Sequence, residues 1–243
     1  VVKRIKAPPS DLQTMLLRVE PRALARLLRA APRDETLEVL LEVLGDTDEW
    51  RDLRIPARIA EVLLELLDAV VAAQADPEVR GIVLEGRGKA FMAGADVKFF
   101  ARSIETGDFE GILRFTRFGQ EVLRRIESSA KPVIALVDGA ALGGGTELAL
   151  ACRARVVTPK AVFRLPETSL GIYPGLGGTQ RLPRLIGKEL AKYYIFTGAV
   201  LGAKEALALG LADAVLPPDE ALEHAKRLAG SGWKALCMRE SRP

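Results

Sequence analysis

Two glutamates in this sequence are the residues best suited to transfer protons. Glu147 begins an apolar helical segment directly after the glycine run 143–145, and Glu167 follows Pro166 at a break further along the chain. A carboxylate acts as a general base, and once protonated it acts as a general acid. The backbone N–H groups of a glycine turn could stabilise negative charge on a carbonyl oxygen. Two acids that meet at such a turn could therefore transfer protons beside a polarised carbonyl group.

Each of these features also has a simpler interpretation. Glycines between a strand and a helix could serve only to let the two elements pack closely. Glu147 could be a surface residue that complements the helix dipole, and Glu167 could be a solvated loop residue. The glycine run reproduces neither the dinucleotide-binding fingerprint nor a phosphate-binding loop, because no Gly-Lys-Ser/Thr follows it. The motif alone leaves packing and chemistry open.

A second turn could complete a site for a carbonyl oxygen. Residues 91–96 (Phe-Met-Ala-Gly-Ala-Asp) also follow a predicted strand and precede a predicted helix. Two such turns, each with one free backbone N–H, could form an oxyanion hole. Taken alone, the second turn would be a glycine turn with Asp96 as a helix N-cap.

Other catalytic chemistries lack the residues that they need. The one histidine, His224, lies in a charged helical segment, which argues against a Ser-His-Asp or Cys-His mechanism. Neither CxxC nor HExxH occurs, so we expect no metal site built from protein ligands. The two cysteines, Cys152 and Cys237, are too few for a disulfide framework, and Cys152 is expected to be a buried, reduced thiol. Glutamates remain as the acid–base pair.

The composition is that of one large globular domain, or of a domain with a small appendage. The 243 residues are 49% hydrophobic and 28% charged, which excludes wholesale disorder. A net charge of +3 is too small to indicate nucleic-acid binding, although it would suit an anionic ligand. No apolar run reaches the ~18 residues of a membrane span, and no apolar signal region follows the basic start. We therefore expect a cytoplasmic protein.

Strands and helices alternate over most of the chain, which predicts an α/β domain. Strands are predicted over residues 80–86, 133–137, 154–158 and 214–216, and helices over 60–73, 111–126, 146–152, 187–197 and 203–210. Residues 171–181 are predicted to form a glycine-rich loop. Residues 11–45 predict short helices that are separated at Pro21 and Pro32. Five arginines are expected to form a solvated basic face there: Arg18, Arg22, Arg26, Arg29 and Arg33.

Together these segments resemble the crotonase superfamily, and within it the enoyl-CoA hydratases. The matching blocks occur in the family's order, at residues 76–80, 88–98, 131–135, 139–149, 166–184, 197–198 and 206–212. They include Ala-Leu-Gly-Gly-Gly-Thr-Glu at 141–147 and Pro-Glu at 166–167. The resemblance covers roughly residues 60–229, and so many ordered blocks make it specific.

The resemblance implies a spiral of ββα units, usually assembled as a trimer or a dimer of trimers. It implies that the backbone N–H groups of Ala95 and Gly144 hold the thioester oxygen of an acyl-CoA substrate. Glu147 would orient and deprotonate water for attack at the β-carbon, and Glu167 would handle the proton at the α-carbon.

The resemblance also locates the coenzyme A part of the substrate. Four residues would line this site: Ala93, Asp96, Val97 and Lys98. Because coenzyme A enters as part of the substrate, no separate cofactor is expected.

Both ends of the chain depart from the family pattern. Residues 49–57 stand where the family has an Asn-Arg-Pro…Asn-Ala-Leu segment after a β-hairpin, and the family's C-terminal helices have no counterpart. The chain is therefore divided into a helical, Arg-rich N-terminal segment (1–50), a crotonase-like catalytic core (51–229) and a short C-terminal tail (230–243).

The sequence leads to the hypothesis of a hydratase for 2-enoyl-CoA, as one module of a larger fatty-acid oxidation protein. One alternative is an enoyl-CoA isomerase, which mainly needs Glu167, and another is a different acyl-CoA enzyme of the same fold. A third hypothesis is a non-catalytic scaffold with residues 1–50 as its interaction module. The retention of Glu147 favours hydration, whereas the altered ends favour the scaffold.

Overall fold

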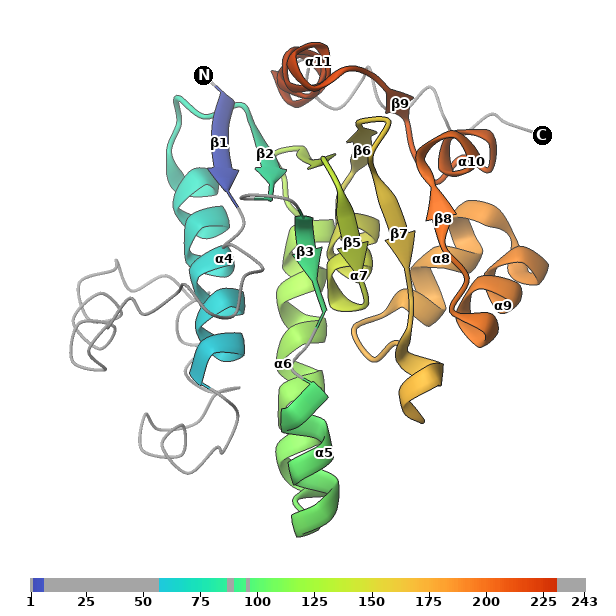
Figure 1. Cartoon of the computed structure of the whole chain (residues 1–243). Coiled ribbons are helices and arrows are strands. Elements are labelled where there is room, and N and C mark those ends of the chain that lie inside the picture. The colour runs from blue at the N-terminus through green and yellow to red at the C-terminus, as the bar shows by residue number, and fades with distance from the viewer. Residues whose placement is uncertain (1, 7–56, 87–89, 95–96, 231–243) are drawn as a thin grey trace.

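The structure, a computed structural model, describes residues 2–6, 57–86, 90–94 and 97–230. Within these ranges the strands form two sheets, and helices pack against them (Figure 1). The helices expected in residues 11–45 lie outside the described residues, as does nearly all of the expected tail 230–243. The proposed division of the chain into three segments therefore stays a prediction.

The two sheets differ in their strand directions. One sheet has the order β1-β2-β4-β6-β9 and is parallel throughout. Its strands are Val2–Lys6, Gly81–Glu85, Val133–Val137, Ala154–Val157 and Ala214–Val215. The other has the order β3-β5-β7-β8, in which only β8 is antiparallel to its neighbour. Its strands are Ala90–Ala93, Ala140–Leu142, Val162–Arg164 and Leu201–Gly202.

Successive strands enter the two sheets in turn. β2, β4 and β6 belong to the five-stranded sheet, and the strand that follows each of them belongs to the four-stranded sheet. A helical segment then completes each turn of the spiral: α5 (Val97–Thr106) with α6 (Phe109–Glu127), α7 (Gly144–Ala151), and η1 (Glu167–Leu170) with α8 (Gly178–Ile186). This strand–strand–helix order confirms the predicted α/β fold of ββα units.

Four further helices frame this spiral. They are α4 (Ala57–Ala75), α9 (Lys188–Thr197), α10 (Ala203–Ala208) and α11 (Pro218–Gly230). α4 packs beside α6, and α11 lies across β2 and β4 on the other face of the five-stranded sheet (Figure 1). The five-stranded sheet is thereby covered on both faces.

This double covering explains why β4, and β2 as far as Leu84, are apolar runs. In β2, Ile82 and Leu84 join the main core with residues of α4 and α6, whereas Val83 packs with alanines of α11. Ile134 and Leu136 of β4 lie on the α11 side in the same way. Parallel strands that are buried on both faces typically have this composition, because both faces pack against apolar side chains.

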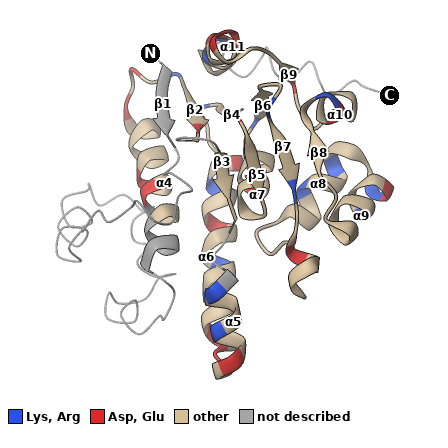
Figure 2. Ribbon diagram, in the orientation of Figure 1, with Lys and Arg blue, Asp and Glu red and all other residues tan. Residues whose placement is uncertain are grey.

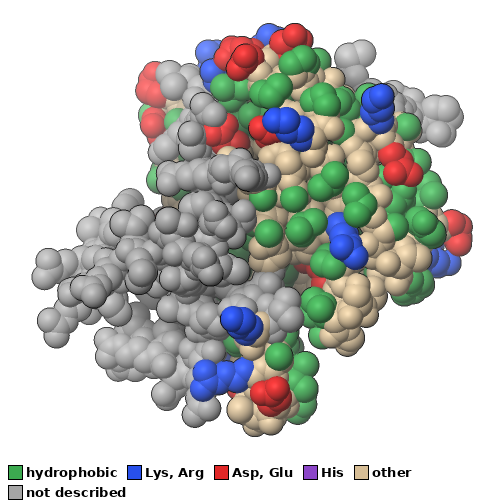
Figure 3. Space-filling view, in the orientation of Figure 1, with side chains coloured by type: hydrophobic (Ala, Val, Ile, Leu, Met, Phe, Trp, Pro, Cys, Tyr) green, Lys and Arg blue, Asp and Glu red, His purple; other side chains and the backbone are tan. Residues whose placement is uncertain are grey.

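Charged residues lie mainly on the helices (Figure 2). On the face shown in Figure 3, cationic and anionic side chains are scattered among apolar ones, which agrees with the small net charge of +3. Among the described residues, no helix is both long enough and apolar enough to cross a bilayer.

Some elements were not predicted from the sequence. The predicted strands 133–137, 154–158 and 214–216 correspond to β4, β6 and β9, and the predicted helices correspond to α4, α6, α7, α9 and α10. β1 lies inside the segment that we expected to be helical, and α8 begins inside the expected loop 171–181. β5 and β7 have three residues each, which is too short for a period-two pattern to be visible.

We expect Gly81→Ala to destabilise the fold. A β-carbon at Gly81 would overlap the carbonyl oxygen of Ala229, so α11 would have to move away from β2. Overpacking of this kind costs about 1–3 kcal/mol in unfolding free energy. Chemical denaturation measures this loss. Gly202→Ala is the matched control, because nothing lies within 4 Å of its added β-carbon. Equal stability of the two variants would contradict this account of how α11 packs.

Candidate active site

The candidate site lies where three neighbouring strands end. β3, β5 and β7 run parallel and side by side, so their carboxyl ends lie at one edge of the four-stranded sheet. Gly94 follows β3, the glycine run 143–145 follows β5, and Glu167 follows β7 by three residues (167 − 164). The spiral thereby brings together segments from three parts of the sequence.

The three glycines of the run differ in whether the structure requires glycine at their positions. Gly143 has φ 54°, a left-handed value that other residues rarely adopt. A β-carbon at Gly145 would overlap the carbonyl oxygen of Met92, so this glycine allows α7 to pack on β3. Gly144 begins α7, and its β-carbon would meet only Leu176 Cδ1, at 3.4 Å. The packing interpretation therefore holds for Gly145, and Gly144 has no such steric need.

Gly144 presents a backbone N–H at the start of α7. The first N–H groups of a helix have no partner within the helix. In α7, Gly143 donates to Arg164 O at 2.9 Å and Glu147 donates to Gly143 O at 3.0 Å. The N–H of Gly144 is the first of the helix, and it lies at the positive end of the helix dipole.

The second turn lies beside the glycine run. Gly94 donates its N–H to Leu142 O at 2.7 Å, and a β-carbon at Gly143 would lie 3.5 Å from Gly94 Cα. Ala93 ends β3 with an exposed side chain, and Lys98 is exposed on α5. Ala95 and Asp96 lie outside the described residues, and Val97 is described only as the first residue of α5.

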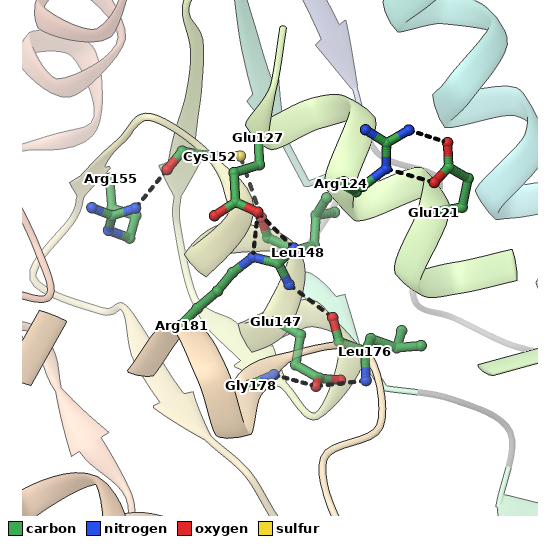
Figure 4. Close-up of polar contacts among 10 residues, drawn as sticks. All are labelled: Glu121, Arg124, Glu127, Glu147, Leu148, Cys152, Arg155, Leu176, Gly178 and Arg181. Carbon is green, nitrogen blue, oxygen red and sulfur yellow. Dashed lines mark hydrogen bonds and ion pairs between the residues drawn. The ribbon is translucent and has the colours of Figure 1, made fainter. Parts of the chain in front are cut away.

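Glu147 is almost completely buried and is held by a distant loop. Its side chain is 1% exposed, which excludes the interpretation as a surface residue. Its Oε1 accepts hydrogen bonds from the N–H groups of Leu176 at 2.8 Å and of Gly178 at 2.7 Å (Figure 4). Both bonds go to one oxygen, so they fix the orientation of the carboxyl group and leave Oε2 out of this contact.

Glu167 is also buried, at the first position of η1. A β-carbon at Gly143 would lie 3.0 Å from Glu167 Oε1, so this carboxyl group lies against the glycine turn. Within the described part of the chain, the buried Oε2 of Glu167 accepts no hydrogen bond. The Thr168 hydroxyl donates to Ile195 O at 3.0 Å, which ties η1 to α9. A buried carboxyl oxygen of this kind favours a role in proton transfer over loop solvation.

The two acids influence each other's ionisation. Burial raises the pKa of Glu147 to about 7, and the charge of Glu167 adds to this rise. The hydrogen bonds from Gly178 and Leu176 and the Arg181 cation lower the same pKa, but they offset only part of the effect. Burial also raises the pKa of Glu167. With a pKa of about 7, Glu147 can both give and take a proton near neutral pH, which acid–base catalysis requires.

Sequence reasoning missed the groups that hold Glu147. The partners come from the Gly-Leu-Gly-Gly segment at 175–178, which we expected to be a loop too rich in glycine to serve packing. Its glycine content was the available signal, but nothing in the sequence linked it to Glu147. Arg181, which donates to Leu176 O at 2.8 Å, was also missed.

No candidate metal centre emerges from the part of the chain that the structure describes, since no three His, Cys, Asp or Glu residues cluster there. Cys152 is a buried free thiol, and burial raises its pKa to about 12. A thiol with such a pKa is a poor nucleophile near neutral pH.

Comparison with known proteins identifies the family. The enoyl-CoA hydratase/isomerase family model matches residues 57–235, and the chain therefore belongs to this family. Over 173 residues it is 46% identical to a protein of Syntrophomonas wolfei named crotonyl-CoA hydratase, a match that covers 70% of this chain and 64% of that protein. Over 171 residues it is 43% identical to the short-chain-enoyl-CoA hydratase of Clostridium acetobutylicum, with coverages of 70% and 64%.

The structural comparison agrees with this assignment. The crystal structure of an enoyl-CoA hydratase from Bacillus anthracis matches with a TM-score of 0.64 at 39% sequence identity, and the match covers 71% of this chain and 66% of that one. The chain thus spans slightly less than two thirds of the length of the two curated relatives described above.

We expect the Glu147 carboxylate to make the protein less stable as the pH rises. Because its folded-state pKa lies near 7 and its unfolded value near 4.5, the folded state binds the proton more tightly, and stability falls between these pH values. The difference corresponds to about 3 kcal/mol, as an order of magnitude. Glu147→Gln keeps an oxygen for both N–H groups but cannot ionise. The unfolding free energy of this variant should therefore fall much less as the pH rises.

Unfolding free energies between pH 5 and pH 8 test this expectation. Glu105→Gln, at an exposed glutamate on α5, is the control and should retain the wild-type pH dependence. A Glu147→Gln variant whose stability falls as steeply as that of the wild type would be inconsistent with the buried, ionisable carboxyl group.

Proposed function

We propose that this chain catalyses the addition of water across the 2,3 double bond of an enoyl-CoA thioester. The observation that carries the proposal is the pair of buried carboxyl groups, Glu147 and Glu167, at one glycine turn, where the charge of Glu167 raises the pKa of Glu147. Membership of the enoyl-CoA hydratase/isomerase family supports the same reaction. The relatives named as crotonyl-CoA and short-chain-enoyl-CoA hydratases support a short acyl chain.

Glu147 acts on the water molecule in this proposal. Its Oε1 is engaged by two backbone N–H groups, so Oε2 is the oxygen that orients water and removes its proton. The water oxygen then forms a bond to the β-carbon, and the electrons of the double bond move towards the thioester carbonyl. A pKa of about 7 suits a general base that works near neutral pH.

Glu167 acts at the α-carbon. Burial raises the pKa of Glu167 above that of an exposed glutamate, which brings it closer to the pH range in which this step takes place. Transfer of this proton to the α-carbon completes the addition, and the proton taken from water stays on Glu147. Exchange between the pair and solvent restores the starting state. The unpaired Oε2 of Glu167 agrees with a group that makes its contacts with substrate.

The thioester oxygen needs donors at the moment when it becomes negative. The N–H of Gly144 supplies one donor at the start of α7, and the N–H of Ala95 supplies the second from the turn after β3. The short contact between Gly94 and the glycine run supports this pairing of the two turns. Loss of one such donor typically costs about 3 kcal/mol of transition-state stabilisation.

The remaining parts of the proposal concern binding and assembly. Ala93, Asp96, Val97 and Lys98 line the coenzyme A site, and no separate cofactor takes part. The protein works in the cytoplasm as a homo-oligomer, a trimer or a dimer of trimers. Exposed apolar side chains on α9, among them Tyr193 and Phe196, support an assembled state.

A hydration assay tests the two acids. With crotonyl-CoA as substrate, the loss of absorbance of the conjugated double bond measures turnover. We expect activity in the wild type and a loss of about 10²–10⁴-fold in kcat for both Glu147→Gln and Glu167→Gln, because each removes one acid–base group. Circular dichroism checks that both variants fold.

Other outcomes would point elsewhere. If the wild type moved the double bond instead of adding water, and only Glu167→Gln lost this activity, isomerisation would replace hydration as the proposed function. Folded protein that neither hydrates nor isomerises the substrate would overturn the enzymatic proposal and favour the scaffold.

The oxyanion donor is tested by a pair of variants at Gly144. Gly144→Pro removes the N–H, and proline is well tolerated as the first residue of a helix. Gly144→Ala keeps the N–H and adds a β-carbon with an ordinary contact to Leu176. We expect the proline variant to lose about 10²–10³-fold in kcat and the alanine variant to stay near the wild type. Equal activities of two folded variants would remove Gly144 from the proposed oxyanion hole.

A further inference from the structure

The loop that holds Glu147 is itself held from two sides. In residues 175–178, the carbonyl groups face donors from helices, and two of the N–H groups face Glu147. Gly175 O accepts a hydrogen bond from Gln120 Nε2 at 2.7 Å, and Leu176 O accepts one from Arg181 Nη1 at 2.8 Å. Gly177 O accepts the N–H groups of Gln180 and Arg181, at 3.0 and 2.9 Å.

Two of these carbonyl groups, those of Gly175 and Gly177, belong to peptide units whose N–H groups bond the carboxylate, and the peptide that accepts Arg181 Nη1 lies between these two units. The peptide between Gly175 and Leu176 receives Gln120 at its oxygen and donates to Glu147 at its nitrogen. The peptide between Gly177 and Gly178 receives the first turn of α8 and donates to Glu147 in the same way. A donor on the carbonyl of a peptide polarises its N–H, so each outer bond strengthens the inner one.

The geometry points to Arg181 and Gln120 as positioning residues for Glu147, which clamp residues 175–178 so that two backbone N–H groups stay aimed at Oε1 of the catalytic carboxylate. This assignment rests on the proposed role of Glu147 as the base. It extends the site to α6, which carries Gln120, and to α8, which carries Arg181.

The guanidinium of Arg181 is largely shielded from solvent and is held by hydrogen bonds to Glu127. Its side chain is 10% exposed, and its Nε and Nη2 donate to Oε2 of Glu127 on α6, at 3.2 and 2.9 Å (Figure 4). A β-carbon at Gly177 would overlap Arg181 Nη1, and Gly177 also has φ 105°. Glycine at this position lets the guanidinium lie directly against the loop.

The clamp also places a charge near the carboxylate. The charged groups that face Glu147 in the described part of the chain are Glu167 of η1, which raises its pKa, and Arg181 of α8, which lowers it. β3 and β5 also pack on α7 but carry no ionisable residues. From α6, Glu127 faces Arg181 and partly neutralises it. Removing Arg181 and removing the charge of Glu127 should therefore move the pKa of Glu147 in opposite directions.

Four single variants test the clamp. Arg181→Met removes the cation, Gln120→Leu removes the amide donor, and Glu127→Gln keeps an oxygen for Arg181 but removes the negative charge. Arg184→Met is the matched control, because it removes an exposed arginine from the same helix. Each variant is made with and without Glu147→Gln. The unfolding free energy of each pair is measured as a function of pH. The pH-dependent difference between the two members of a pair gives the pKa of Glu147 and requires no turnover.

We expect the pKa of Glu147 to rise in Arg181→Met and in Gln120→Leu, and to fall in Glu127→Gln. The acidic limb of the kcat/KM profile should move by the same amounts, and kcat should fall by about 10²-fold in Arg181→Met because the base is misplaced. Arg184→Met should change neither the pKa nor kcat.

Two kinds of result would overturn the assignment. Shifts in the same direction in Arg181→Met and Glu127→Gln, or no shift in either folded variant, would reduce Arg181 to a structural residue. An unchanged pKa in Gln120→Leu would remove Gln120 from the clamp. Because the unfolding measurement needs no substrate, it tests the clamp even if the wild type does not hydrate enoyl-CoA.

Discussion

A carboxyl group inside a protein must find hydrogen-bond donors, and much of this structure is arranged to supply them to Glu147. Unpaired burial of an ionised carboxylate costs several kcal/mol. The donors come from a loop that reaches back over α7 and is secured by α6 and α8. With a pKa of about 7, the carboxyl group retains part of the cost of burial. This uncompensated part of the burial cost keeps the pKa of Glu147 near neutral pH. Burial of the carboxyl group therefore both constrains the fold and makes the group suitable for proton transfer.

Glycine is required around the Glu147 carboxylate because neighbouring segments of the chain pack closely there. Gly145 lets α7 lie on β3, and Gly143 turns the chain with a positive φ beside Glu167. At Gly178, a β-carbon would lie 3.1 Å from Glu147 Oε1. Each position is limited by space or by backbone angle, and none of them needs flexibility. At these three positions, glycine thus serves close packing and a tight turn beside the two carboxyl groups.

The pattern of residues predicted the α/β class and the candidate acids for identifiable physical reasons, whereas the spiral of ββα units followed from the family resemblance. Buried parallel strands are apolar runs, and β4 was recognised from such a run before a glycine turn. Glu147 stood out as one acid in an otherwise apolar helix. The donors of its hydrogen bonds could not be predicted, because they are backbone groups whose direction depends on tertiary structure. β1 and α8 were missed because a basic strand and a glycine-rich helix start both lack clear local patterns.

The long sequence separation between Glu147 and its donors also constrains the order in which the protein can fold. Leu176 and Gly178 lie 29 and 31 residues beyond the carboxylate. While the ribosome is still making that stretch, α7 has no partner for its acid and gains little from leaving water. The hydrogen bonds of Glu147 can therefore form only after residues 176–178 have been synthesised, so the site cannot be complete before the third turn of the spiral is present.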